Sequence, residues 1–135
     1  MESEADPVTA ACEAEWNKWK SDCSGFAKAV ARRLGIILIG QANSMIDALE
    51  DSSRWVKLGA DRKAAVTRAQ MGDLVIGGLK AHGHGHIVIV VKTSSAAYPI
   101  AYWGRFGAVG KKRTAINWSW NKTDLPKVQF YAAKR

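Results

Sequence analysis

The chain has 135 residues and a mass of 14.7 kDa, which is the size of one domain and below the size at which a single core divides. Apolar residues make up 47% and charged residues 24% of the chain, and this ordinary globular composition excludes a disordered or fibrous protein. The formal net charge is +8, and residues 105–135 hold eight basic residues against one acidic residue. This balance favours an anionic partner, such as a nucleic acid, an acidic membrane surface or a cell-wall polymer.

The N-terminus and the longest apolar runs argue against a Sec-exported protein and against an integral membrane protein. Residues 1–7 are acidic and contain no apolar stretch, so we predict no Sec-type signal peptide. The longest apolar runs, Ile36–Ile39 and Ile87–Val91, are far shorter than the roughly 20 residues of a membrane helix. Cys12 and Cys23 are too few for a disulfide scaffold, so one of them is free to serve chemistry.

Four helices are predicted in the first half of the chain. The first starts with Asp6 as N-cap and Pro7 at its first position, and its apolar face contains Val8, Cys12, Trp16 and Trp19. Cys12 is therefore interpreted as a buried apolar residue. The second helix starts at Ser21 or Asp22 and ends at Leu34, before Gly35. We expect Ser44 to cap a third helix and Asp61 to cap a shorter one that ends near Gln70.

The second half changes to the patterns of strands. The five predicted strands are Asp73–Leu79, His86–Lys92, Tyr98–Trp103, Arg113–Trp120 and Lys127–Ala133. Helices followed by a run of strands with short connections predict an α+β fold, with N-terminal helices packed on an antiparallel sheet. Residues 1–135 are expected to form one domain.

Cys23 is the candidate nucleophile because it falls in the first turn of the second predicted helix. A helix N-terminus and a nearby imidazole both lower the pKa of a thiol. Gly25 adds no side chain beside the sulfur, so a substrate carbonyl has room to approach. The N–H groups of the first turn can stabilise an oxyanion.

The candidate bases are His82, His84 and His86, the three histidines of the chain. If this segment were a strand, all three side chains would share one face, which is also a pattern of metal sites. Gly83 and Gly85 make the segment flexible and no acidic residue lies nearby in the sequence, so we predict no metal site and no cofactor. His86 directly precedes an apolar run and is best placed to be held rigidly.

The order of these motifs resembles the papain-like peptidoglycan amidases of the NlpC and CHAP kind. It is similar, more narrowly, to the first family of type VI secretion amidase effectors, over roughly residues 10–131. The residues that carry this likeness are Asp22-Cys-Ser-Gly-Phe26, Ala29-Val30, Leu34-Gly35, Asn43-Ser-Met45, Asp47, Leu49, Leu74-Val-Ile76, Gly78-Leu-Lys80, Gly85-His86 and Gly107-Ala-Val-Gly110.

The resemblance implies an antibacterial cysteine amidase that cuts the peptide stems of peptidoglycan at the γ-D-glutamyl-diaminopimelate bond. Cys23 would form the acyl-enzyme and His86 would act as general base. Ser24, Gly25 and Gly85 are expected to contact substrate. The resemblance also implies a monomer made without a Sec signal, secreted by the type VI machinery into the periplasm of a target bacterium, and blocked by a cognate immunity protein.

Two parts of the pattern stay open. In such sites a third group usually orients the imidazole, but Tyr98–Trp103 contains no His, Asn or Asp, which leaves a main-chain carbonyl near Trp103 or a tyrosine hydroxyl. Residues 104–112 lack the residues that a phosphate-binding loop requires, and we expect this glycine-rich loop to shape the cleft.

The alternative function is a small basic module that binds nucleic acid or cell wall without catalysis. Six tryptophans are many for this length, and Trp118 and Trp120 would share one face of a predicted strand. Basic residues interleaved with aromatic ones are typical of nucleic-acid binding. This alternative leaves the pairing of Cys23 with His86 unexplained, so we expect no nucleic-acid partner and no membrane insertion.

Overall fold

A computed structural model describes residues 6–93 and 98–134; residues 1–5, which belong to the acidic N-terminus, lie outside this description. The helices are α1 (Pro7–Trp19), α2 (Cys23–Arg33), α3 (Ala42–Asp51) and α4 (Arg62–Gln70). The strands are β1 (Trp55–Gly59), β2 (Val75–Leu79), β3 (His86–Val91), β4 (Ile100–Trp103), β5 (Lys111–Ala115) and β6 (Gln129–Ala133). Two short 3-10 helices, η2 (Ile116–Trp118) and η3 (Leu125–Lys127), connect β5 to β6.

Aspartate N-caps start three of the four helices where the sequence predicts them. The side chains of Asp6, Asp22 and Asp61 each accept a hydrogen bond from the backbone N–H three residues later, which satisfies a first-turn donor that has no partner inside the helix. Leu34 ends α2, and Gly35 follows with a φ of 79°, a conformation that glycine adopts without strain. The cap at Asp22 sets Cys23 as the first residue of α2.

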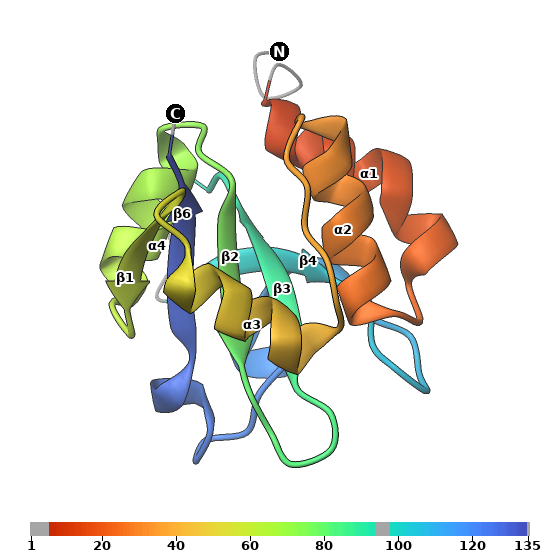
Figure 1. Ribbon diagram of the computed structural model, residues 1–135. Helices are drawn as coiled ribbons and strands as arrows, with labels where there is room; N and C mark the ends of the chain where they lie inside the picture. The colour runs from red at the N-terminus through yellow and green to blue at the C-terminus, as the bar shows by residue number, and fades with distance from the viewer. Residues whose placement is uncertain (1–5, 94–97, 135) are drawn as a thin grey trace.

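The six strands form one sheet in the order β1-β6-β2-β3-β4-β5, and every neighbouring pair is antiparallel. The predicted α+β class is therefore confirmed. Figure 1 shows β2 and β3 at the centre of the sheet, with α3 in front of them. β3 is thus a central strand, it packs against α2, and His86 is its first residue.

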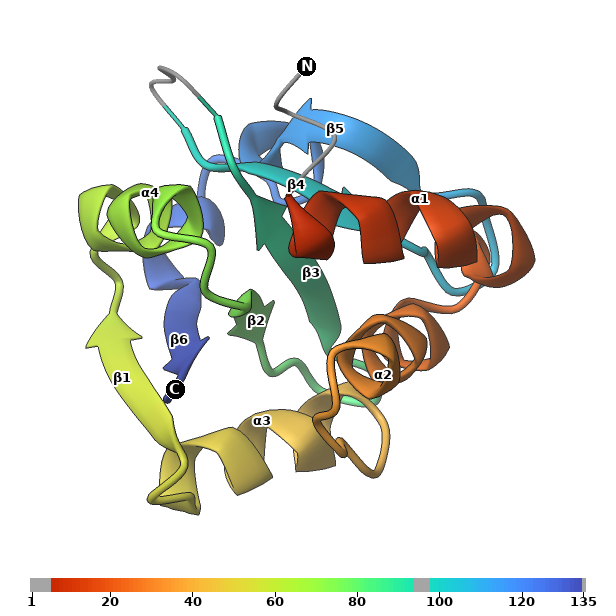
Figure 2. The ribbon, with the colours of Figure 1, turned by 90° about the horizontal axis from the view of Figure 1, so that it is seen from above.

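Helices cover both faces of this sheet. Viewed from above, α1, α2 and α3 follow one another along one face, and α4 lies on the other (Figure 2). β3 reflects this in its alternation: Ile87, Ile89 and Val91 pack in the core under α1–α3, whereas Val88 and Val90 pack in the core with α4. Burial on both faces explains why β3 is a continuous apolar run.

Three local predictions were wrong or incomplete. α3 begins at Ala42, and Ser44 is its third residue, where it joins a capping box with Gln41, an arrangement that the Ser44 N-cap prediction did not consider. The predicted strand Arg113–Trp120 ends at Ala115 and continues as η2, so Trp118 and Trp120 do not share a strand face: Trp118 is 70% exposed and Trp120 is buried. Strand β1 was not predicted at all.

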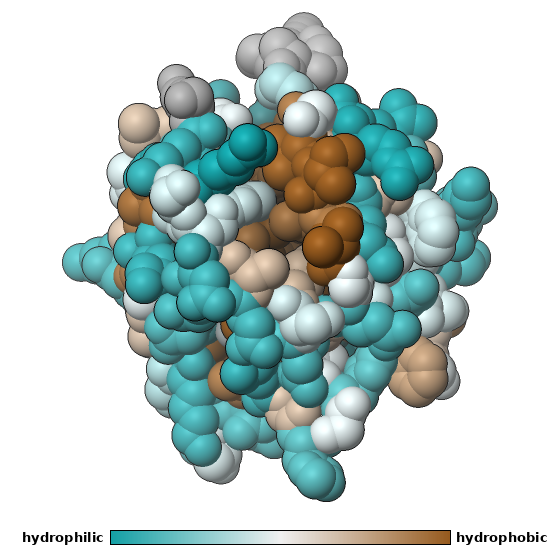
Figure 3. All heavy atoms as spheres, viewed as in Figure 1, coloured by the Kyte–Doolittle hydropathy of each residue, from teal (hydrophilic) through white to brown (hydrophobic). Residues whose placement is uncertain are grey.

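The connection between α2 and α3 leaves apolar side chains on the surface. Ile36 and Leu38 pack against the core, whereas Ile37 and Ile39 are exposed. They border a hollow of about 490 Å³ whose floor includes Met45 and Trp55, and Figure 3 shows this apolar patch on the face that it displays. Among the described residues, no helix has the length and apolar character that crossing a membrane requires.

Candidate active site

The Cys23 thiol lies at the contact between the start of α2 and the start of β3. Burial has the largest effect on the thiol and raises its pKa; the residue is only 1% exposed. The backbone N–H groups of Ile87 and Ser24, close to Sγ, lower the pKa, as does the charge of Arg105, whereas the charge of Asp22 raises it. At rest Cys23 is therefore a protonated thiol with donors already in place for a developing negative charge.

His86 lies immediately before Ile87, so the β3 backbone that contacts the thiol also carries the imidazole. Two tryptophan rings, Trp103 and Trp120, meet the imidazole edge-on, with centroids 6.4 Å and 5.1 Å away. Burial lowers the pKa of His86 from its ordinary value to about 3, with smaller contributions from the charges of Arg105 and His84. The resting imidazole is neutral, which is the state that a base needs.

The third group at the histidine is a serine that the sequence pattern did not predict. Ser119 Oγ lies 2.6 Å from Nε2 of His86; in the tautomer in which Nε2 carries the proton and donates to this oxygen, Nδ1 is the nitrogen that can receive a proton. The Trp103 carbonyl accepts a hydrogen bond from Trp16 Nε1, and the hydroxyls of Tyr102 and Tyr131 donate to glutamates. Ser119 follows η2 and lies 33 residues from His86 in sequence, so only the tertiary structure could reveal the contact.

Arg105 holds Ser119 in place. Its Nη2 donates to the backbone carbonyl and to Oγ of Ser119, at 2.8 Å and 3.0 Å. It also lies 3.5 Å from Nε2 of His86. Arg105 therefore binds both the main chain and the side chain of Ser119, next to the imidazole of His86.

Ser24 and Gly25, both expected to contact substrate, are engaged within the protein. The Ser24 hydroxyl and the Gly25 N–H both donate to Asp22 Oδ1, and both residues are buried. A Cβ at Gly25 would lie 2.5 Å from the Trp19 ring, so close packing against Trp19 accounts for this glycine. The N–H of Gly25 serves the helix cap, whereas the N–H of Ser24 faces the thiol.

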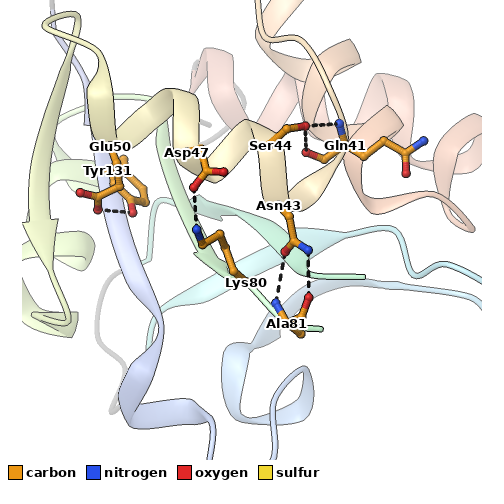
Figure 4. A network of polar contacts seen from close by, with 8 residues as sticks. All are labelled: Gln41, Asn43, Ser44, Asp47, Glu50, Lys80, Ala81 and Tyr131. Carbon is orange, nitrogen blue, oxygen red and sulfur yellow. Dashed lines mark hydrogen bonds and ion pairs between the residues drawn. The ribbon is translucent and has the colours of Figure 1, made fainter. Parts of the chain in front are cut away.

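Gly85, the third residue expected to contact substrate, packs against Asn43 of α3. A Cβ at residue 85 would lie 2.2 Å from Asn43 Oδ1 and 2.9 Å from the Leu79 carbonyl oxygen. Asn43 in turn donates to the carbonyl of Ala81 and accepts from its N–H, at 2.8 Å and 3.1 Å, as Figure 4 shows together with the neighbouring Lys80–Asp47 ion pair. These contacts tie the loop before His86 to α3.

His82 and His84 lie outside the strand, in the exposed loop that ends where β3 begins. The three histidines thus do not share a strand face. His84 stacks against the exposed Phe106 with ring centroids 4.5 Å apart. In the part of the chain that the structure describes, no three His, Cys, Asp or Glu side chains gather in a way that could hold a metal ion.

Comparison with known proteins agrees with this architecture. Residues 14–100 match the model of the NlpC/P60 family; this range includes Cys23 and His86, whereas Arg105 and Ser119 lie beyond it. The chain is also 36% identical over 144 residues to the peptidoglycan amidase Tse1 of Pseudomonas aeruginosa, an alignment that covers 97% of this chain and 92% of that protein. With a match of this extent, the chain belongs to the NlpC/P60 family and is a hydrolase of the cysteine-peptidase kind.

Proposed function

We propose that the protein hydrolyses an amide bond in the peptide stems of peptidoglycan, with Cys23 as nucleophile and His86 as general base. The observation that carries the proposal is the joint arrangement of the two residues. The thiol faces the N–H of Ile87, and the neighbouring imidazole is bound through Nε2 by Ser119. The similarity to a peptidoglycan amidase over nearly the whole chain supports the choice of substrate.

In this mechanism proton transfer accompanies attack. Both groups are neutral at rest, because burial raises the pKa of the Cys23 thiol and lowers that of the His86 imidazole. Nδ1 of His86 takes the thiol proton as Sγ bonds to the carbonyl carbon. The same proton passes to the leaving nitrogen as the C–N bond breaks. A water molecule, deprotonated by His86, then releases the acyl group from Cys23.

We infer from the family resemblance that the cleaved bond joins the γ-carboxyl of D-glutamate to diaminopimelate and that the enzyme is an antibacterial effector. It would reach the periplasm of a target bacterium through a type VI secretion machine as a monomer, and a cognate immunity protein would protect the producer. The many basic residues after residue 104 would favour encounter with an anionic cell wall.

Digestion of purified diaminopimelate-type peptidoglycan, followed by mass analysis of the released peptides, tests both the activity and the bond. We expect Cys23→Ala and His86→Ala each to lower turnover on the order of a thousandfold or more. Cys12→Ala is the matched control, because Cys12 is equally buried but lies inside α1 rather than at the start of a helix. It should retain nearly full activity.

Two outcomes would overturn the proposal. Equal loss of activity in all three variants, with the proteins folded, would show that the two cysteines are not distinguished by catalysis. No release of peptides by the folded, reduced wild type would favour the binding-module alternative. The effector role is tested separately: expression directed to the periplasm of a susceptible bacterium should cause lysis, and cytoplasmic expression should not.

A further inference from the structure

Arg105 has more hydrogen-bonding capacity than the protein uses. A guanidinium carries five N–H donors, and the bonds to Ser119 use Nη2 alone. Among the residues that the structure describes, Nε and Nη1 of Arg105 have no hydrogen-bond partner, and no carboxylate forms an ion pair with it. The residue as a whole is only partly exposed.

The backbone of Arg105 is hydrogen-bonded to the connection between α1 and α2, just before Cys23. Its N–H donates to the Lys20 carbonyl at 3.0 Å, and the N–H of Gly110 donates to the same oxygen at 2.7 Å. Lys20 lies three residues before Cys23. Both ends of the loop thus bind one oxygen of the α1–α2 connection, and the bonds from Nη2 to Ser119 hold the guanidinium itself.

The charge of Arg105 acts on both reacting groups, with opposite consequences for the reaction. It favours the Cys23 thiolate and opposes the imidazolium that His86 must become when it takes the proton. An anion bound to the free donors of the guanidinium would weaken both effects while substrate is present, so the imidazolium would form more easily and the thiolate would be favoured less.

We propose that Arg105 binds a substrate carboxylate next to the scissile amide through the N–H groups of Nη1, while Nη2 positions Ser119. This inference rests on the proposed function. In a γ-linked glutamyl residue the α-carboxyl group is not part of the peptide chain, so the residue that acylates Cys23 carries this negative charge itself. Arg105 therefore selects stems whose glutamyl α-carboxylate is free over stems in which it is an amide.

The test compares two synthetic stem peptides, L-Ala-γ-D-Glu-diaminopimelate-D-Ala and its α-carboxamide counterpart. The wild type should cleave the free acid with kcat/KM about 10- to 100-fold higher, the range expected for loss of charge-assisted hydrogen bonds. Arg105→Met should cleave both peptides at similar rates, and Arg105→Lys should keep part of the preference, because lysine has the charge but not the planar guanidinium donors.

The ratio of kcat/KM for the free-acid peptide to kcat/KM for the carboxamide peptide distinguishes substrate recognition by Arg105 from a merely structural role. Ser119→Ala removes the hydroxyl at His86 but keeps the Ser119 carbonyl that binds Nη2 of Arg105 and leaves Nη1 unchanged, so it should slow cleavage of both peptides equally and preserve the ratio of their rates. Arg54→Met is the matched control, since Arg54 is an exposed cation next to β1, at the opposite edge of the sheet from β5. It should change neither rate.

If the Arg105 variants turn over too slowly, binding of both peptides to Cys23→Ala and to Cys23→Ala/Arg105→Met, measured by calorimetry, provides the same comparison. Equal cleavage of both peptides by the wild type, or an unchanged ratio in Arg105→Met, would overturn the inference and leave the proposed function standing. Cleavage of neither peptide and no digestion of peptidoglycan would contradict the proposed function itself.

Discussion

A methyl group at residue 85 would collide with Asn43, and shortening Asn43 should relieve much of the collision. The Cβ of Gly85→Ala would lie 2.2 Å from Asn43 Oδ1 and 2.9 Å from the Leu79 carbonyl oxygen. The backbone of Gly85 does not have a positive φ, so alanine alone would slightly favour folding by restricting the unfolded chain. The sign of the effect therefore depends on the two contacts.

The expected cost follows from what must move. Asn43 can turn away only by giving up its two hydrogen bonds to the backbone of Ala81, at about 1 kcal/mol each. The contact with Leu79 requires a shift of backbone and adds about 1 kcal/mol. Gly85→Ala should thus lower the free energy of unfolding by about 2–3 kcal/mol, and Asn43→Ala by about 2 kcal/mol.

A double-mutant cycle measured by urea unfolding tests this reasoning. In the Asn43→Ala background, Gly85→Ala should cost only about 1 kcal/mol, so the double variant is less destabilised than the sum of the single changes by about 1–2 kcal/mol. His82→Ala, in the same loop but exposed, is the control and should stay within about 0.5 kcal/mol of the wild type. Additive single and double variants would refute the assignment of Asn43 as the residue that requires glycine at 85.

Two further predictions concern His86. Ser119→Ala should lower kcat about tenfold with little change in KM, because the hydroxyl 2.6 Å from Nε2 orients the imidazole rather than binding substrate. Ser119→Thr, which keeps a hydroxyl, should retain much of the wild-type rate. An unchanged kcat in Ser119→Ala would contradict this role. The pKa of His86 is lowered from 6.5 to about 3, so as the pH falls through this window the unfolded chain takes up a proton that the folded protein does not, and the free energy of unfolding should decrease. Chemical denaturation at several pH values should show a shallower decrease for His86→Gln than for the wild type, and parallel curves would contradict a neutral buried imidazole.

Local chemistry explains which features could be predicted from the sequence. The caps at Asp6, Asp22 and Asp61 act within three residues, so the starts of three helices, and with them the position of Cys23, are visible in short segments. Strand β1 pairs only with β6 at the far end of the chain, and its own residues show no clear alternation. Its pairing, and hence its existence as a strand, depends on residues more than 70 positions away.

The site residues also fall into those that local patterns predict and those that depend on tertiary structure. Cys23 and His86 stand at the start of a helix and of an apolar strand, and both positions follow from local patterns. Ser119 lies where a predicted strand turns into η2 because Ile116 and Trp120 pack in the core with α4. Its contact with His86 depends on that turn, so a strand prediction over Arg113–Trp120 concealed it.

The carbonyl of Lys20, which accepts from both Arg105 and Gly110, bears on how this enzyme can vary between species. Main-chain atoms anchor both ends of the loop, and a Cβ at Gly104 or Gly110 would come within 2.2 Å or 1.8 Å of a backbone oxygen, so these two positions should tolerate only glycine. The residues between Arg105 and Gly110 are exposed and are free to differ among homologues. Substitutions at these positions can thus change the surface beside Arg105 while the main-chain bonds that attach the loop to Lys20 stay the same.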